Sequence, residues 1–207
     1  MTGVQTCALP ISYYLLGQQR KKSLEDEARL REMEWELRLY LDAEIGPYVP
    51  GKNVKEMLRS AATKWRRGED IKRSLVVIPY RIPLIYDGPR DQVGLWDGGY
   101  RYTAMVANNG INAGRVLRCR PMFPNWSIEV EIAYDPEEID ADFLAIAVER
   151  TQKYGLGDYR PEFGSFKATI TGPEFHRGSR KGLGDKVRDT IAESAHAAHK
   201  DRIIVKA

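Results

Sequence analysis

The sequence predicts an α+β fold in which helices cover one face of an antiparallel sheet. The expected elements follow the order strand, helix, helix, strand, strand, strand, helix, strand, and such runs pack as layers of helices on a sheet. One strand alternates between apolar and polar residues, which is typical of a sheet with a single covered face. With 207 residues and 43% hydrophobic side chains, the chain can form one domain with its own core, expected over residues 12–172.

The first eleven residues, MTGVQTCALPI, resemble the translation of a sequencing-library adapter. This resemblance implies that residues 1–11 are an artefact of a metagenomic gene prediction and that the domain is truncated at its N-terminus. The open alternative is a short signal peptide, although the apolar run CALPI has five residues and follows no basic residue. Cys119 is then the only authentic cysteine, which excludes a disulfide scaffold and fits a reducing compartment.

The first elements rest on residue type and helical spacing. Aromatic and aliphatic residues over 11–16 are typical of a strand. Ser23 is expected to cap a helix over 23–40, because an acid follows three residues later and acids fill the first turn. A Pro-Gly turn leads into a helix over 53–65, whose apolar face includes Trp65.

Strands dominate the following part of the chain. Pro79 breaks a strand over 74–82, and Gly-Pro, Asp-Gly and Gly-Gly pairs mark a loop over 87–99. The strand over 127–134 shows the clean alternation, and a glycine ends the helix over 141–154. Two further strands are expected over 116–119 and 163–170. The whole order predicts a β-α-β-β-α-β core of the ferredoxin-like kind.

The C-terminal tail, residues 173–207, differs in composition from this domain. The tail contains eight basic and five acidic residues, so its net charge of +3 equals that of the whole chain. An alanine-rich stretch over 185–200 predicts one helix with few apolar residues for a core. The tail is therefore expected to be a basic, partly helical extension of the domain.

A basic helix start is the first candidate binding motif. Gly51 follows a proline, and the backbone N–H groups exposed at such a helix start can hold a phosphate. Lys52, Lys55 and Arg59 follow at helical spacing. Residues 52–73 contain eight bases and three acids, a local charge of +5. The alternative is a solvated helix face after an ordinary turn.

The second motif is the glycine-rich stretch 155–164, between a helix and a strand. Gly157 and Gly164 allow positive φ and close approach of the backbone to a ligand. Arg160 supplies a bidentate donor and Tyr159 a stacking face. The alternative is a tight turn from helix to strand.

In the third motif, arginines are interleaved with aromatic residues. Arg115, Arg118 and Arg120 precede Trp126, a pattern that suits single-stranded nucleic acid because guanidinium groups meet phosphates and bases stack on rings. The alternative is a surface strand whose arginines pair with the acids over 129–138.

No catalytic residue, cofactor or metal is expected, so the chain leans toward a protein without enzymatic activity. All three histidines lie beyond residue 175, which removes histidine chemistry from the preceding chain. Three loop carboxylates, Asp87, Asp91 and Asp97, leave a two-carboxylate metal site open, and His196 and His199 could share a metal in the tail. No apolar run approaches the roughly 20 residues of a membrane span.

Together the three motifs resemble the RAMP superfamily, the CRISPR-associated RNA-binding proteins with RRM-like folds. Residues 49–59 align with the family pattern IPG-S-x-[LI]-K-G-x-[LI]-R, and residues 155–166 match its glycine-rich loop. Residues 11–170 also resemble small phage and prophage proteins of the same layout. Two departures are Lys52 in place of the usual serine and Glu56 in place of the usual glycine.

The resemblance implies RNA binding more than RNA cleavage, because the endonucleases of the family usually rely on a histidine. We expect a non-enzymatic nucleic-acid-binding protein of phage or prophage origin, in the cytoplasm of a bacterial host, with single-stranded RNA as partner and no membrane. Alternatives are an accessory or assembly protein that binds a protein or itself, and a metal-dependent nuclease using loop aspartates. The expected nucleic-acid-binding residues are Gly51, Lys52, Lys55, Arg59, Arg115, Arg118, Arg120, Trp126, Gly157, Tyr159, Arg160 and Gly164.

Overall fold

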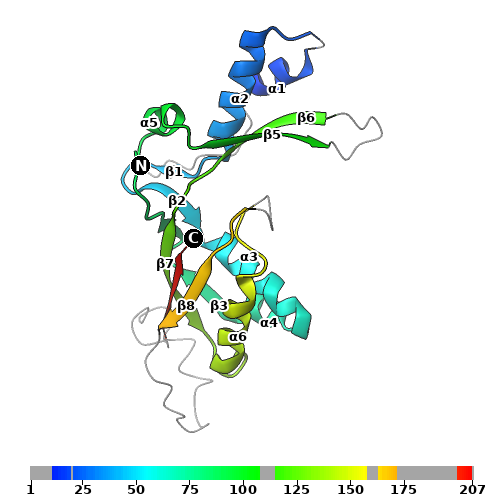
Figure 1. Ribbon diagram of the computed structural model, residues 1–207. Helices are drawn as coiled ribbons and strands as arrows, with labels where there is room; N and C mark the ends of the chain where they lie inside the picture. Colours follow the sequence, from blue (N-terminus) through cyan, green and yellow to red (C-terminus); the bar gives the residue numbers. More distant parts are fainter. Residues whose placement is uncertain (1–10, 20, 108–114, 158–162, 172–199, 207) are drawn as a thin grey trace. The chain divides into compact units, whose positions relative to one another are not determined.

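The structure consists of two compact units that both combine helices with small antiparallel strands, which confirms the α+β class (Figure 1). The first unit comprises Met1–Pro47 and Asp87–Pro124, and the second comprises Tyr48–Tyr86 and Asn125–Ala207. The computed structural model describes residues 11–19, 21–107, 115–157, 163–171 and 200–206.

The first unit contains three helices and a long β-hairpin. Strands β5 and β6 pair antiparallel over their whole length, and α2 packs against β6. The elements in chain order are α1 (Ile11–Gln18), α2 (Leu24–Arg38), β1 (Leu41–Asp42), the start of β2 (Gly46–Pro50), α5 (Gln92–Asp97), β5 (Arg101–Ala107) and β6 (Arg115–Pro121).

Helix α2 begins as the sequence predicts. Ser23 is the N-cap, and it forms a capping box in which its side chain and that of Asp26 each accept from the other's backbone N–H. Trp35 fixes the other end of α2, since it is 1% exposed and its Nε1 donates to the Tyr100 carbonyl at 2.9 Å. The ring of Trp96 meets Trp35 edge-on at 5.2 Å, which joins α5 to this core.

Two predictions for the first unit need correction. The strand expected over 11–16 is wrong, because these residues begin α1, which packs against α2. Short apolar runs do not distinguish strand from helix, and a strand forms only where a partner strand is available. The loop expected over 87–99 contains α5, whose N-cap Asp91 accepts from the Gly94 N–H.

The second unit holds a four-stranded sheet and the helices that cover it. Its elements in chain order are the rest of β2, α3 (Gly51–Ala62), the 3₁₀ turn η1 (Thr63–Trp65), α4 (Gly68–Ser74), β3 (Leu75–Ile78), β4 (Arg81–Pro83), β7 (Ser127–Tyr134), α6 (Ala141–Thr151), β8 (Lys167–Thr171) and β9 (Lys200–Lys206). The strand expected over 74–82 is therefore two strands, and β4 pairs with β2 outside this sheet.

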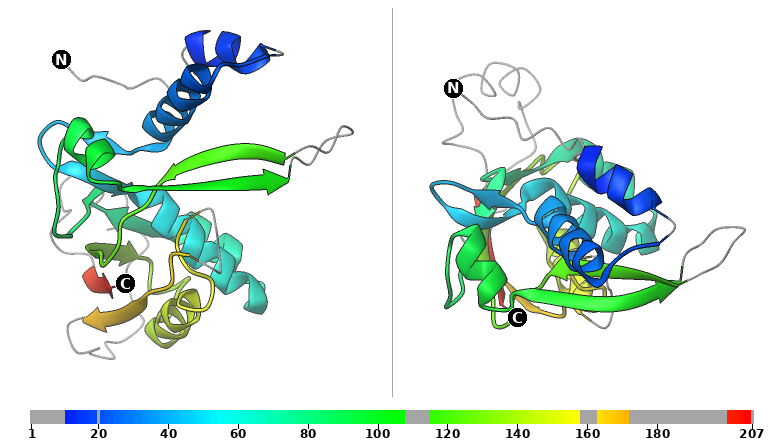
Figure 2. Two further views of the ribbon diagram at one scale, coloured as in Figure 1. Left: turned by 45° about the horizontal axis from the view of Figure 1, so that its top comes forward. Right: turned by 90° about the horizontal axis from the view of Figure 1, so that it is seen from above.

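The sheet has the order β3-β7-β9-β8 with every neighbouring pair antiparallel. Its core face includes the four alternating β7 residues that the sequence predicts, Ile128, Val130, Ile132 and Tyr134, all of them buried. Helices α3 and α6 pack against each other, α3 against β3 and α6 against β8. The left view of Figure 2 shows α6 beside β8.

The expected β-α-β-β-α-β order is not confirmed. The strand before α3 is β2, which pairs with β1 and β4 rather than entering the four-stranded sheet. The position between β7 and β8 belongs to β9, at the end of the chain. The tail helix expected over 185–200 lies outside the described residues, apart from Lys200, which begins β9.

The segment that follows α3 packs against the first turn of α6. The rings of Trp65, after α3, and Phe143, in the first turn of α6, meet edge-on at 5.8 Å. Arg67 donates to Asp140, the N-cap of α6, at 3.0 Å and to the Glu138 carbonyl at 2.6 Å.

Replacement of Asp140 by asparagine is expected to remove a pH-dependent part of the stability. Desolvation raises the pKa of Asp140, but the hydrogen bonds from the Phe143 N–H and the Arg67 guanidinium outweigh it and hold this pKa below its ordinary value. A lowered folded-state pKa stabilises the protein above pH ~4, and this contribution is lost as the pH falls through the folded-state pKa.

Urea unfolding of wild type and Asp140→Asn between pH 3 and pH 7 tests this expectation. The difference in unfolding free energy should stay below about 1 kcal/mol at pH 7, because the Asp140 side chain is 61% exposed, and should shrink toward zero at pH 3. Asp142→Asn is the control, since it makes the same charge change in the first turn of α6 without the Arg67 contact. A pH-independent difference would contradict the assignment.

Candidate nucleic-acid interface

Gly51 begins α3 in a place where a side chain does not fit easily. Its N–H donates to the Tyr80 carbonyl at 2.7 Å, and a Cβ at this position would lie 3.2 Å from the Pro79 carbonyl oxygen. The N-cap Pro50 provides no side-chain acceptor. Gly51 therefore lets the 79–80 turn approach the helix, and the next N–H groups at this helix start are those of Lys52 and Asn53.

The basic residues of α3 lie on the side away from its buried residues. Lys52 is exposed and Lys55 and Arg59 are half-buried, at three- and four-residue spacing opposite the buried Val54 and Leu58. Lys52 and Lys55 form no salt bridge with a described residue, whereas Arg59 pairs with Glu56 at 2.8 Å. Two of the three expected α3 cations thus keep an uncompensated charge.

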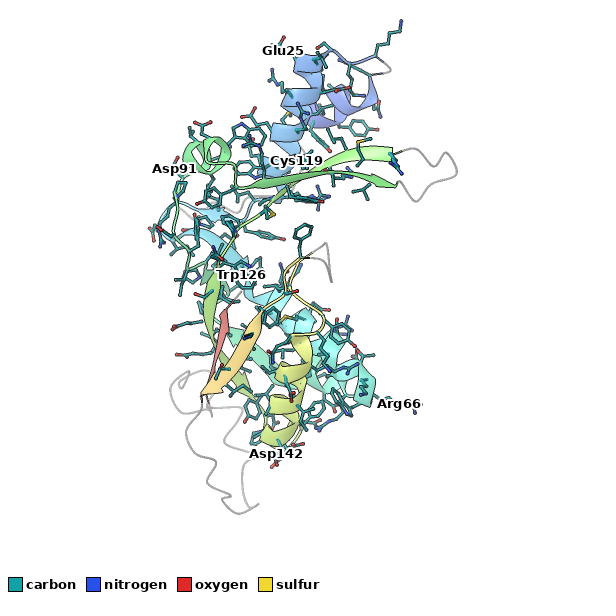
Figure 3. All side chains as sticks on the ribbon, in the orientation of Figure 1. Glu25, Arg66, Asp91, Cys119, Trp126 and Asp142 are labelled. Atoms are coloured by element: carbon teal, nitrogen blue, oxygen red, sulfur yellow. The ribbon has the colours of Figure 1, made fainter. Side chains whose placement is uncertain are left out.

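All three acidic residues of the segment 52–73 form salt bridges with basic residues of the same segment, and four of its eight basic residues take part. Glu56 pairs with Arg59, Glu69 with Lys72 at 3.3 Å, and Asp70 with both Arg67 and Arg73. In the described part of the chain, the bases of this segment without an acid partner are Lys52, Lys55, Lys64 and Arg66. Figure 3 shows Arg66 at the outer surface of the second unit.

The glycine-rich stretch forms a turn closed by its own backbone. Gly155 and Gly164 adopt φ of +74° and +73°, and the Leu156 N–H donates to the Gly164 carbonyl at 2.9 Å. Helix α6 ends at Thr151, three residues before the predicted end, and the Gly155 N–H donates to the Thr151 carbonyl at 3.0 Å in the turn that follows. We call this pair of glycines with Leu156 the glycine turn.

The other residues of this stretch that were predicted to bind nucleic acid are Gly157, Tyr159 and Arg160. Gly157 is exposed with a φ of +114°, and no atom lies within 4 Å of the place that a Cβ would take. Tyr159 and Arg160 lie outside the described residues. The roles predicted for them stay predictions.

The start of α3 and the glycine turn lie at the same end of the sheet. Gly51 donates to the turn that follows β3, and the end of β3 pairs with β7 toward the start of β7. The starts of β7 and β8 both pair with the end of β9, and the glycine turn directly precedes β8. The topology therefore brings together two of the predicted motifs, an arrangement visible at the upper end of this sheet in Figure 1.

Trp126 lies at that end of the sheet as well, immediately before β7. Its ring is half-buried and lies 6.4 Å from the ring of the buried Phe166 at an angle of 54°. The indole thus covers the core at the beginning of the sheet (Figure 3).

The arginines of β6 have a structural role in the first unit. Arg118 and Arg120 donate to one oxygen of Glu34 at 3.0 and 2.7 Å, and the Cys119 N–H donates to the other at 3.1 Å. Glu34 is 5% exposed, so its buried charge needs these partners. Pairing with an acid was the alternative for this motif, but the acid comes from α2 rather than from residues 129–138. Arg115 is exposed at the start of β6.

One of the three loop carboxylates, that of Asp91, serves the local structure of the first unit. The Asp91 side chain caps α5, and the Asp87 carbonyl accepts from the Tyr100 hydroxyl at 3.1 Å. Within the described ranges, no three metal-ligating side chains gather into a group that could hold an ion. His196 and His199 lie outside these ranges. No helix in the described part of the chain is long and apolar enough to cross a membrane.

Sequence reasoning missed one group of side chains around Trp65. The helical pattern placed Trp65 on the buried face of a helix over 53–65, but α3 ends at Ala62 and the turn η1 leaves Trp65 37% exposed. Its neighbours Arg150 and Tyr154 come from α6, so only the folded chain brings them together.

Comparisons of the chain with protein-family models, with curated proteins and with solved structures found no match.

Proposed function

We propose that the protein binds single-stranded nucleic acid, with RNA as the preferred partner, through the helical side of its second unit. The observation that carries this proposal is the set of four cations without an acid partner among the described residues, Lys52, Lys55, Lys64 and Arg66. Phosphate groups are the ligands that such a row of uncompensated cations attracts, and they provide most of the affinity of nucleic-acid-binding proteins.

The end of the sheet where α3 begins adds neutral donors to this charge. The N–H groups of Lys52 and Asn53 have no side-chain cap, and the positive end of the helix dipole favours an anion there. The glycine turn lies at the same end. The resemblance of both segments to RAMP motifs supports RNA as the partner.

We further propose that the second unit is a variant of the ferredoxin-like fold. The order β3-β7-β9-β8, the antiparallel directions and the helices α3 and α6 agree with that fold if β9 takes the place of its first strand. The other face of β7 carries Glu129 and Glu131.

A protein partner is the second candidate, favoured by one observation. Strand β3 stands at the end of the strand order, and its Val76 is 57% exposed. An exposed apolar residue on an edge strand suits the addition of a strand from another chain. Binding of this kind would not weaken steeply with salt.

The charges of Lys52 and Lys55 can be tested by fluorescence anisotropy with a labelled 20-nucleotide single-stranded RNA. Lys52→Gln combined with Lys55→Gln is expected to weaken binding at least tenfold at 50 mM salt, since two phosphate contacts are lost. Lys72→Gln is the matched control, because Lys72 is paired with Glu69 and should change the affinity less than twofold. Equal affinities of wild type and the double variant would contradict the proposal.

A further inference from the structure

A half-exposed tryptophan surrounded by cations lies at the far end of α3 from Lys52. We call the group of Trp65, Arg150, Tyr154 and Lys64 the Trp65 platform. The Arg150 guanidinium lies 5.4 Å from the centre of the Trp65 ring and 5.2 Å from that of Tyr154, and the Lys64 ammonium lies 5.6 Å from Trp65. Phe143 supports the indole edge-on from α6.

The charge of Arg150 is held by aromatic groups and not by a carboxylate. One terminal nitrogen donates to the Tyr154 hydroxyl at 2.8 Å, and the Nε is buried without a hydrogen-bond partner in the described structure. No described acid pairs with Arg150, Lys64 or Arg66. The platform therefore combines a planar ring with two uncompensated cations, and Arg66 follows Trp65 directly in the chain.

Arg67, which is close in sequence to Trp65, is a structural arginine whose charge is paired with carboxylates. Its guanidinium lies 4.0 Å from the centre of the Phe143 ring, but it also pairs with Asp70 and Asp140 at 3.1 and 3.0 Å. Likewise, the structural tryptophan Trp35 is 1% exposed, whereas Trp65 is 37% exposed. Trp65 differs from Trp35 in its exposure, and Arg150 differs from Arg67 because no described acid pairs with it.

We propose that the Trp65 platform is a base-stacking site for single-stranded nucleic acid, in which a base stacks on Trp65 and the flanking phosphates contact Arg150, Lys64 and Arg66. This inference rests on the proposed function and assigns it a second contact point. An exposed indole ring beside arginine suits an unpaired base, because the faces of bases in a duplex are already stacked. Helix α3 spans about 18 Å between its ends, so one strand running along it meets Lys52 and Lys55 at one end and the platform at the other.

Three substitutions separate stacking from charge in anisotropy titrations. Trp65→Ala is expected to weaken binding of the single-stranded RNA about tenfold and to leave the salt dependence unchanged, because no charge is removed. Trp65→Phe should recover part of this loss. Arg150→Gln should weaken binding and also reduce the magnitude of the slope of log affinity against log salt by about 0.7. Ile146→Ala is the control, as this α6 residue is 48% exposed and lies outside the platform.

The same titrations with a single-stranded DNA and with a duplex of equal sequence identify the ligand. Single-stranded RNA and single-stranded DNA should both bind more tightly than the duplex. The ratio of the RNA affinity to the DNA affinity shows which of the two single strands is preferred. If circular dichroism shows that Trp65→Ala does not fold, the affinities of Trp65→Phe and Arg150→Gln provide the test of the stacking site. Wild-type affinity in all platform variants, together with weaker binding by the Lys52/Lys55 variant, would overturn this inference and leave the proposed function intact. Absence of nucleic-acid binding by the wild type would overturn both.

Discussion

Replacement of Glu34 by alanine is expected to lower the free energy of unfolding by about 3 kcal/mol, the lower end of the range for breaking a buried ion pair. The Glu34 carboxylate accepts from Arg118, Arg120 and the Cys119 N–H, and its removal takes one acceptor away from each of these three donors. The Arg120 side chain is 17% exposed, so the loss of its contact with Glu34 contributes most to the destabilisation. The Arg118 side chain is 35% exposed and can be partly solvated by water.

Urea unfolding followed by tryptophan fluorescence tests this expectation, because Trp35 is adjacent to Glu34 and contacts Trp96. Glu34→Gln should cost less than Glu34→Ala, since the amide keeps one acceptor oxygen. Glu32→Ala is the matched control, as Glu32 is exposed on the same helix and should change stability by under about 0.5 kcal/mol. A Glu34→Ala protein as stable as the control would contradict the structural role given to Arg118 and Arg120.

Replacement of Gly164 by alanine is expected to lower the free energy of unfolding by at least about 3 kcal/mol. The added Cβ would overlap the Leu156 carbonyl oxygen, and the positive φ of +73° disfavours a side chain by a further ~1–2 kcal/mol. The clash also breaks the hydrogen bond from the Leu156 N–H to the Gly164 carbonyl. The glycine turn should therefore open in this variant.

Gly157→Ala provides the control for Gly164. Its φ of +114° is strained for alanine, but no atom lies within 4 Å of the new Cβ, so only backbone strain of ~1–2 kcal/mol is expected. Thermal unfolding of both variants measures the difference. If both lose the same stability, then the overlap with Leu156 contributes nothing and the closed turn is not maintained in solution.

Features encoded within a few residues were predictable from the sequence. The capping box at Ser23 and the buried alternation of β7 follow from local spacing, and the structure confirms both. Helical and strand spacing also predicts one core of ten residues, Trp35, Leu39, Val54, Leu58, Ile128, Val130, Ile132, Leu144, Val148 and Phe166. All ten are buried, but Trp35 and Leu39 lie in the first unit and the other eight in the second. Local periodicity identifies buried faces, but it does not tell which buried faces meet.

Features that depend on distant partners were not predictable. Glu34 lies 84 residues from Arg118, so no spacing pattern connects them. Strand β9 follows the helix expected over 185–200, and no strand was expected in the tail, although Ile203, Ile204 and Val205 are a β-branched run that could have indicated one. Arg150 and Trp65 come together only because α6 packs against α3.

The central claim, that the second unit binds single-stranded nucleic acid through uncompensated cations, is tested most directly by a salt titration of RNA affinity. Between 50 and 200 mM salt, the logarithm of the wild-type association constant is expected to fall linearly with a slope of about −3.5, as five phosphate contacts on a single strand require. The variant with Lys52, Lys55, Lys64, Arg66 and Arg150 all changed to glutamine should show a slope near zero. Wild-type protein that binds no RNA at 50 mM salt, or a slope equal in both proteins, would contradict the account.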